Sequence, residues 1–471
     1  MAEQSEGPSD LHRGLPMVAA WEPETLAREK ADLAELATKG LGTRLWGYSK
    51  KMGPGWMQSA LTLGSGSFFS SFFSGAMLGY ALIWAQPLGM LLGIVMFAAV
   101  AHQTLSTGVR PFDAMRRYVH PALAWAWAIG SLVSTVFWHF AQYSCGGTVC
   151  ADLADFAGWA GAGQSVGARL LFGVLILAVS IAVTWLYGSG SRGIRIYEKV
   201  IKGMVALIIL AFLLVVVRTG VDWGALGRAF TEFPGNITGH ARGATLAMAG
   251  LSAAVGINMT FLFPYTLLAR GWGREHRGLA RFDLAAGMWL PFTLAVSLLL
   301  IAAANTMYDP ANPVTSAVSP VRAAEVLSGA AGQVVGRVAF DIGVLGMCLS
   351  SITLHMLVCA FVVCEVLGIE PTGWRYRLAC LIPTPAVLGT VLWAKFPFWL
   401  PIVVAVLSLL LLPIAYIGYF VLHNRRAYLG ADKPTGLRAV GWNLAMLLAI
   451  AVVAGGCITY IVTAALPKLL G

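Results

Sequence analysis

The feature that most constrains this chain is a series of eleven apolar stretches, each long enough to cross a lipid bilayer. Backbone polar groups find no water inside a bilayer, so stretches of this kind must form helices. Only 11% of the residues are charged, against roughly 25% in soluble domains. The predicted spans are 54–80, 83–106, 122–149, 167–187, 195–217, 243–269, 284–307, 334–366, 376–393, 398–421 and 438–466. The sequence therefore predicts an all-α polytopic membrane protein whose first partner is the lipid bilayer.

Basic residues divide unequally between the two sides that these spans define. If the N-terminus is cytoplasmic, 24 of the 32 Lys and Arg residues fall in inner segments. Basic residues accumulate in cytoplasmic loops, so this bias predicts a cytoplasmic N-terminus and an external C-terminus. It also explains the net charge of +10 without a nucleic-acid partner. We expect an integral plasma-membrane protein, and in a bacterium one of the inner membrane.

Two of the predicted spans are interrupted in a similar way. The first contains LGSGSFFSS (63–71), and the sixth contains GINMTFLFPY (256–265). They lie five spans apart, and five is an odd number, so a second block of five would run inverted relative to the first. Discontinuous helices in corresponding positions of inverted repeats indicate a transporter whose substrate lies between them. The simpler interpretation is that Gly and Ser only allow helices to pack closely.

This repeat divides the chain into five predicted parts. They are a cytoplasmic leader with a short amphipathic helix (1–50), a first repeat of spans 1–5 (51–217), an outer loop with the sequon NIT (218–242), a second repeat of spans 6–10 (243–421), and an inner loop followed by the eleventh span (422–471).

Several short segments resemble the Nramp family of divalent-metal transporters. They are GPGW (53–56), SGAMLGYALIW (74–84), SSIT (350–353) and LLPIAYIGYFVLHNRRAYLG (411–430). The resemblance extends over about residues 50–466. It implies a LeuT-type fold, with spans 1–5 and 6–10 as inverted repeats and an eleventh span added.

The resemblance also locates a candidate substrate site, where this sequence departs from the family. The family's D-P-G-N motif in span 1 falls on Gly64, Ser65, Gly66 and Ser67, and its M-P-H motif in span 6 on Ile257, Asn258 and Met259. With the flanking Gly256 and Thr260, these residues form the predicted substrate site. The acidic pair that carries protons in the family's span 3 falls on His139 and Gln142, and a span 10 Gln falls near Leu411.

These replacements leave no acidic side chain at the predicted site. A dehydrated divalent ion usually needs a carboxylate among its ligands, so we expect no bare manganese or iron site and no set of metal-ligating side chains. A hydrated ion such as magnesium is still an alternative substrate. The GSG motif also resembles the G-S-G signature of amino-acid transporters in the amino acid–polyamine–organocation superfamily. That resemblance implies a small carboxylate-bearing or neutral solute, which Phe68, Phe69, Phe72 and Phe73 could surround unless they only pack between helices.

Few ionisable side chains lie within the spans. His139, Asp341 and His355, together with Gln142, are the candidates for coupling transport to protons. Histidine titrates near neutral pH, but a buried neutral histidine held by hydrogen bonds is an equally simple interpretation. Asp341 and His355 share one face of span 8, about 21 Å apart along the axis.

The sequence as a whole predicts a secondary transporter that works by alternating access. The competing hypothesis is a non-transporting sensor on a transporter scaffold. A transporter that had become a sensor would be expected to lose side chains that bind the transported substrate. No nucleophile elbow, phosphate-binding loop or zinc-protease motif is present in the sequence. We therefore expect neither an enzyme nor a bound cofactor.

Overall fold

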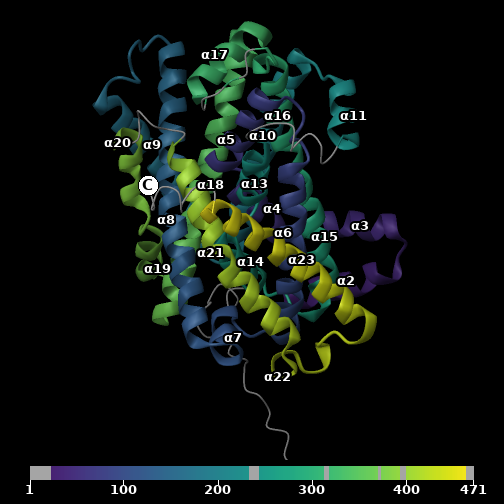
Figure 1. Ribbon diagram of the computed structural model, residues 1–471. Coiled ribbons are helices and arrows are strands. Elements are labelled where there is room, and N and C mark those ends of the chain that lie inside the picture. Colours follow the sequence, from purple (N-terminus) through teal and green to yellow (C-terminus); the bar gives the residue numbers. More distant parts are fainter. Residues whose placement is uncertain are drawn as a thin grey trace, which may run out of the picture.

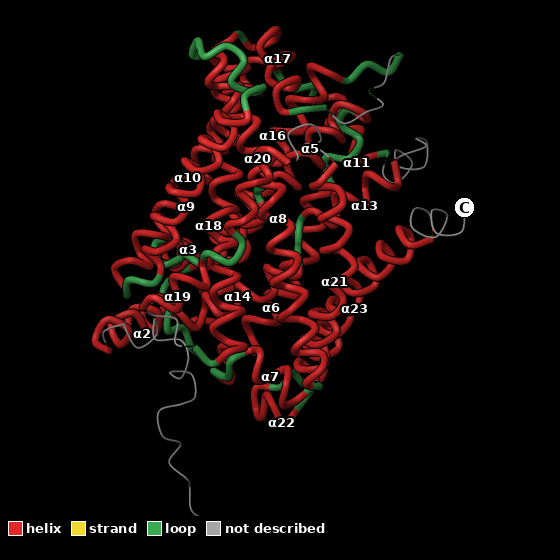
Figure 2. Tube along the Cα trace, turned by 90° about the vertical axis from the view of Figure 1, so that its left-hand side faces the viewer, coloured by secondary structure: helices red, strands yellow, loops and turns green. Residues whose placement is uncertain are grey.

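A computed structural model describes residues 23–232, 243–311, 314, 318–369, 373–392 and 399–462. These residues form helices joined by loops. The long helices run side by side in one elongated bundle, as two perpendicular views show (Figures 1 and 2). Within the described residues, eight helical segments are long and apolar enough to cross a membrane. They are α6 (Ala85–Thr107), α8 (Pro121–Phe156), α9 (Val166–Tyr187), α10 (Ser191–Thr219), α15–η3–α16 (Arg277–Asp283, Leu284–Trp289 and Leu290–Met307), η4–α18 (Gln333–Ala339 and Phe340–Leu367), α21 (Trp399–Asn424) and α23 (Gly436–Tyr460).

Both predicted interruptions are present. The first span consists of α4 (Pro54–Thr62) and α5 (Ser65–Leu78), and the sixth of α13 (Gly243–Ala253) and α14 (Ile257–Ala269). The Thr62 hydroxyl donates a hydrogen bond of 2.9 Å to the carbonyl of Ala254, so the two breaks face each other in space. A pair of broken helices joined at the same depth is the arrangement that the repeat predicted.

The ninth span differs from the prediction of one continuous helix over 376–393. It consists of α19 (Gly373–Cys380), the 3-10 turn η5 (Thr384–Leu388) and the short α20 (Gly389–Leu392). Pro383 and Pro385 lie at the interruption. Proline has no backbone N–H and its ring collides with the preceding helical turn, so the helix ends before them.

Shorter helices cap the two ends of the bundle. They are α2 (Pro23–Thr38), α3 (Leu41–Ser49), α7 (Pro111–Tyr118), α11 (Trp223–Thr231), η2 (Arg274–His276), α17 (Pro320–Ala331), α22 (Arg426–Leu429) and η6 (Gly430–Asp432). The two views place α11 and α17 at the end opposite to α2, α7 and α22. This separation agrees with the predicted alternation of loops. The sequon at 236–238 lies outside the described residues.

Burial distinguishes central from peripheral helices. In the most apolar 18-residue window of η4–α18, 89% of the residues are buried, whereas the value for α23 is 22%. Leu444 and Leu448 of α23 remain exposed. A helix that is apolar but uncovered on one side is suited to contact with lipid. The candidate site is therefore expected next to α18, against which α4, α5, α8 and α14 pack.

Candidate functional site

The break in the first span is short and held by side chains. Leu63 and Gly64 connect α4 to α5, and Gly64 is extended, with φ −140° and ψ −166°. The Ser67 hydroxyl donates to the carbonyl of Thr62 across the break, at 2.5 Å. A broken helix leaves backbone carbonyls without partners inside the protein, and neighbouring hydroxyls can satisfy them.

Helix α18 supplies most of these hydroxyls. The Ser351 hydroxyl lies 3.1 Å from the carbonyl oxygens of both Leu61 and Leu63. The Ser350 hydroxyl lies 3.3 Å from the carbonyl of Ala60. The serine-rich segment of span 8 therefore holds the open end of α4.

Gln142 occupies the space beside Gly64. Its side-chain oxygen accepts a hydrogen bond of 2.8 Å from the backbone N–H of Ser65. A Cβ atom on residue 64 would lie 2.5 Å from the Gln142 amide nitrogen and 2.6 Å from the Ser351 hydroxyl. Only glycine fits between these two groups as they stand. The place where the resemblance puts an acidic ligand is therefore filled by a neutral amide.

The second break supplies the opposite wall. Gly256, at the start of α14, donates its N–H to the sulfur of Met259 at 3.4 Å. The Asn258 side chain accepts from the N–H of Met259 at 3.0 Å. Thr260 instead accepts a hydrogen bond of 2.9 Å from the indole of Trp127. Asn258 and Met259 therefore belong to the site, whereas Thr260 belongs to the surrounding core.

A small cavity of about 30 Å³ lies between the two breaks. Its lining comes from Leu61, Thr62, Gly64, Gly66, Ser67, Trp138, Gln142, Gly256, Asn258, Met259, His355 and Ser408. Of the predicted substrate residues, Ser65, Ile257 and Thr260 do not line it. The volume suits a water molecule or a small ion rather than an organic solute in this conformation.

Trp138 and Ser408 line this cavity although sequence reasoning did not identify them. The Trp138 indole donates to the Ser408 hydroxyl at 2.7 Å, and Ser134 lies 2.6 Å from the same hydroxyl. A Cβ on Gly66 would come within 2.4 Å of the Trp138 ring, so the ring lies directly against the break. The only signal in the sequence was the position of Trp138 next to His139.

The described lining contains no carboxylate, lysine or arginine. Within the part of the chain that the structure describes, no group of three or more His, Cys, Asp or Glu side chains could hold a metal ion. The polar groups that remain are amides, hydroxyls, an imidazole and a thioether. Helices α5 and α14 both begin at the cavity, and helix N-termini carry partial positive charge.

Two of the predicted coupling residues lie together, and Asp341 lies apart from them. The rings of His139 and His355 are 5.7 Å apart, and Tyr143 lies 5.2 Å from His139. Both histidines are buried, and neither ring nitrogen of His139 has a hydrogen-bonding partner among the described residues. Asp341 is near the start of α18, and its carboxyl group faces Asp152, which binds Arg337 at 2.8 and 2.9 Å.

The phenylalanines after the GSG motif do not surround the cavity. Phe68 and Phe72 stack with ring centroids 5.7 Å apart, and both contact Phe340 of α18. Neither lines the cavity. The packing interpretation therefore holds for this pair.

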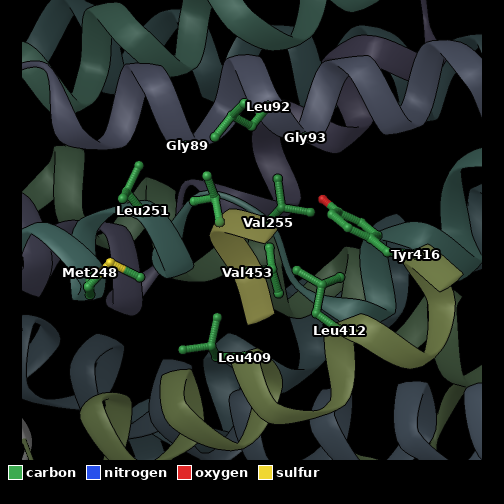
Figure 3. Close-up of a pocket in the computed structure, with 11 residues that line it drawn as sticks. Gly89, Leu92, Gly93, Met248, Leu251, Val255, Leu409, Leu412, Tyr416 and Val453 are labelled. Carbon is green, nitrogen blue, oxygen red and sulfur yellow. The ribbon is translucent and has the colours of Figure 1, made fainter. Parts of the chain in front are cut away.

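A second cavity shows what an apolar site in this bundle looks like. It lies between α6, α13, α21 and α23 (Figure 3). Its lining is aliphatic apart from the hydroxyl of Tyr416 and the sulfur of Met248. Without convergent polar groups it offers no basis for orienting a solute, so the cavity at the two breaks is the better candidate.

Most of the chain is similar in sequence to known membrane transporters. Residues 55–462 match a family described as natural resistance-associated macrophage protein-like, or Nramp. A divalent metal cation transporter of Deinococcus radiodurans is 24% identical over 411 residues, covering 84% of this chain and 87% of that protein. One of Acidiphilium cryptum is 25% identical over 84% of this chain and 90% of its own length.

Solved structures have the same fold at low identity. A manganese transporter of Eremococcus coleocola superposes with a TM-score of 0.69 at 15% identity, covering 91% of this chain and 90% of its own. Mhp1, a nucleobase-cation-symport-1 transporter, gives 0.57 at 15% identity, covering 87% of this chain and 90% of its own. These likenesses confirm the predicted all-helical transporter fold with two broken spans.

Proposed function

The chain belongs to the Nramp family, and on this basis we propose that it is a secondary transporter that moves its substrate through the paired breaks by alternating access. The support from the structure is the small cavity between α4–α5 and α13–α14. Discontinuous helices at a repeat interface are where transporters of this kind bind their substrate. The cavity lies against α18, the most buried of the spanning segments.

The proposed substrate is a divalent cation that keeps part of its hydration shell. Curated relatives are named as divalent metal cation transporters. The observation that carries the proposal is the neutral lining, in which Met259, His355, Asn258 and Ser67 offer sulfur, nitrogen and oxygen donors without a carboxylate. Neutral donors can replace some water ligands, but they do not compensate the ion's charge. Binding should therefore be weak, and tight binding of dehydrated manganese is not expected.

A second candidate substrate is a small solute that carries a carboxylate. The observation that favours it is the convergence of two helix N-termini, those of α5 and α14, on a cavity without negative side chains. Partial positive charge at helix N-termini attracts anions. This candidate requires the cavity to enlarge from about 30 Å³ during the transport cycle.

Uptake into proteoliposomes tests these proposals. We expect manganese and magnesium uptake by the unmodified protein only at high concentration. In G64D/Q142A/S351A the shortened residues 142 and 351 make room for the new acid, so manganese affinity should rise by roughly tenfold. Q142A/S351A is the matched control and should not gain affinity.

Two results would count against the cation. Tight manganese uptake by the unmodified protein would disprove the argument from the neutral lining. The second candidate would be established by two results together. Neither the unmodified protein nor the variant with aspartate at position 64 would take up the cations, and the unmodified protein would accumulate a small carboxylate from a panel of solutes.

We further propose that the buried pair His139 and His355 couples transport to protons. His355 lines the cavity and His139 lies next to His355, with ring centroids 5.7 Å apart. His139 has no competing hydrogen bond among the described residues. In the same vesicles an inward proton gradient should accelerate uptake, and H139Q should abolish this acceleration while leaving exchange of substrate without a gradient intact. A gradient effect that survives in H139Q would contradict the assignment.

A further inference from the structure

Cavities follow the contact between α6 and α23 from the middle of the bundle to one end. The apolar cavity of Figure 3 includes Gly89 and Gly93 of α6. Next along the helix is an open groove of about 470 Å³, formed by Ile94, Val95, Ala98, Arg438, Gly441, Trp442 and Ala445. Beyond it is a pocket of about 90 Å³, which we call the basic pocket, lined by Ala98, Ala101, His102, Arg277, Arg281, Arg438 and Trp442. The groove and the basic pocket share Ala98, Arg438 and Trp442, so they are continuous.

The basic pocket carries more positive than negative charge. Its nearest acid is Asp432, which pairs with both Arg274 and Arg277 at 2.9 Å. Arg281 and Arg438 are exposed and have no ion pair with any described residue. Two arginines that converge without a counter-charge attract an anion, and planar guanidinium groups suit phosphate oxygens.

The adjoining groove has the opposite character. Apart from Arg438 at its mouth, its lining is Ile, Val, Ala, Gly and Trp. It opens on the outer surface of the bundle, where α23 also exposes Leu444 and Leu448. In a membrane this surface faces hydrocarbon, and Trp442 between the basic pocket and the groove is typical of the headgroup boundary.

From this juxtaposition we infer that the α6–α23 contact binds an anionic phospholipid. Its phosphate lies in the basic pocket between Arg281 and Arg438, and one acyl chain lies along the groove. From His102 to Ile94 the α6 axis rises about 12 Å, which is most of the roughly 15 Å of one leaflet's hydrocarbon layer. The site therefore matches a whole lipid better than a free anion, which would use the basic pocket alone.

Lipid retention measured by native mass spectrometry on the purified protein tests this inference. We expect phosphatidylglycerol to be retained and phosphatidylcholine to be released. R281Q/R438Q should weaken phosphatidylglycerol binding roughly 30-fold, since each arginine near an anionic headgroup contributes about fivefold. The control R192Q/R375Q removes two other exposed arginines and should change binding less than about twofold.

A second variant separates the lipid from a free anion. Gly441 lines the groove, and a Cβ there meets no heavy atom within 4 Å, so G441L should place its side chain in the groove. It should weaken phosphatidylglycerol binding and leave inorganic phosphate binding unchanged. The inference is overturned if R281Q/R438Q and R192Q/R375Q retain phosphatidylglycerol equally. It is also overturned if inorganic phosphate displaces the lipid and G441L has no effect, because the basic pocket would then bind free anions.

Discussion

At the scale of single residues, neutral hydrogen bonds hold a broken helix open. Gln142 binds the N–H of Ser65 on one side of the break, and Ser351 lies near the carbonyls of Leu61 and Leu63 on the other. These groups satisfy a backbone that would otherwise have neither water nor helical partners. The same two side chains, Gln142 and Ser351, fill the space beside Gly64. They therefore both stabilise the break and leave no room there for an acidic side chain.

Ser351 provides a prediction at this scale. S351A removes a buried donor and leaves carbonyl oxygens without it, so the free energy of unfolding in detergent should fall by roughly 1–3 kcal/mol. S180A is the matched control, because the Ser180 hydroxyl is equally buried and has no partner among the described residues. Denaturant titration of both variants measures the difference. Equal losses would show that the hydrogen bonds of Ser351 do not support the break.

At the scale of elements, the start of α4 is fixed to the seventh span. The backbone N–H groups of Gly53 and Gly55 donate to one oxygen of Asp283, at 3.2 and 2.8 Å. A Cβ on Gly55 would lie 2.2 Å from the backbone oxygen of Asp283. The GPG segment therefore allows two backbones to approach closely at one end of the bundle. A contact this close between α4 and the seventh span would have to break if α4 moves during transport.

Glycine 55 provides the prediction for this contact. G55A should lower the free energy of unfolding by roughly 1–3 kcal/mol, because backbone atoms cannot move aside as a flexible side chain can. G203A in α10 is the control, since a Cβ there meets no heavy atom within 4 Å and alanine favours a helix interior by about 1 kcal/mol. Both are measured by unfolding in detergent. A G55A variant as stable as G203A would mean that this contact is looser than the structure indicates.

At the scale of the whole molecule, the two ends of the bundle should lie on opposite sides of the membrane. The short helices α11 and α17 cap one end, and α2, α7 and α22 cap the other. The arginine and lysine count predicts that the second group is cytoplasmic. Native cysteines interfere little with a labelling test, because six of the seven are buried and Cys150 is half-buried.

Labelling with a membrane-impermeant maleimide tests this orientation. R228C in α11 should react in intact cells, whereas R192C at the start of α10 should react only after permeabilisation. Both arginines are exposed, which makes the pair matched. The reverse pattern would invert the proposed topology.

Much of the architecture could be predicted from the sequence, because it depends on local properties. A span requires only a sufficient run of apolar residues, and the breaks at 63–64 and 254–256 follow from clustered Gly, Ser and Asn. The prediction of one continuous helix for the ninth span was wrong, because the prolines at 383 and 385 interrupt an apolar run that is otherwise long enough to cross the membrane.

The composition of the site was decided by the tertiary structure. At 64–67 the resemblance to the family predicted a site without the acidic ligand, but not that the Gln142 amide fills the space beside Gly64. Trp138 and Ser408 come from different repeats, and His139 meets His355 while Asp341 lies elsewhere along α18. The physical reason is that a helix shows its own apolarity and its interruptions in sequence, whereas the partners of each face depend on how distant helices pack. The sequence by itself determined the spans and the two breaks, and only packing decided which side chains meet between them.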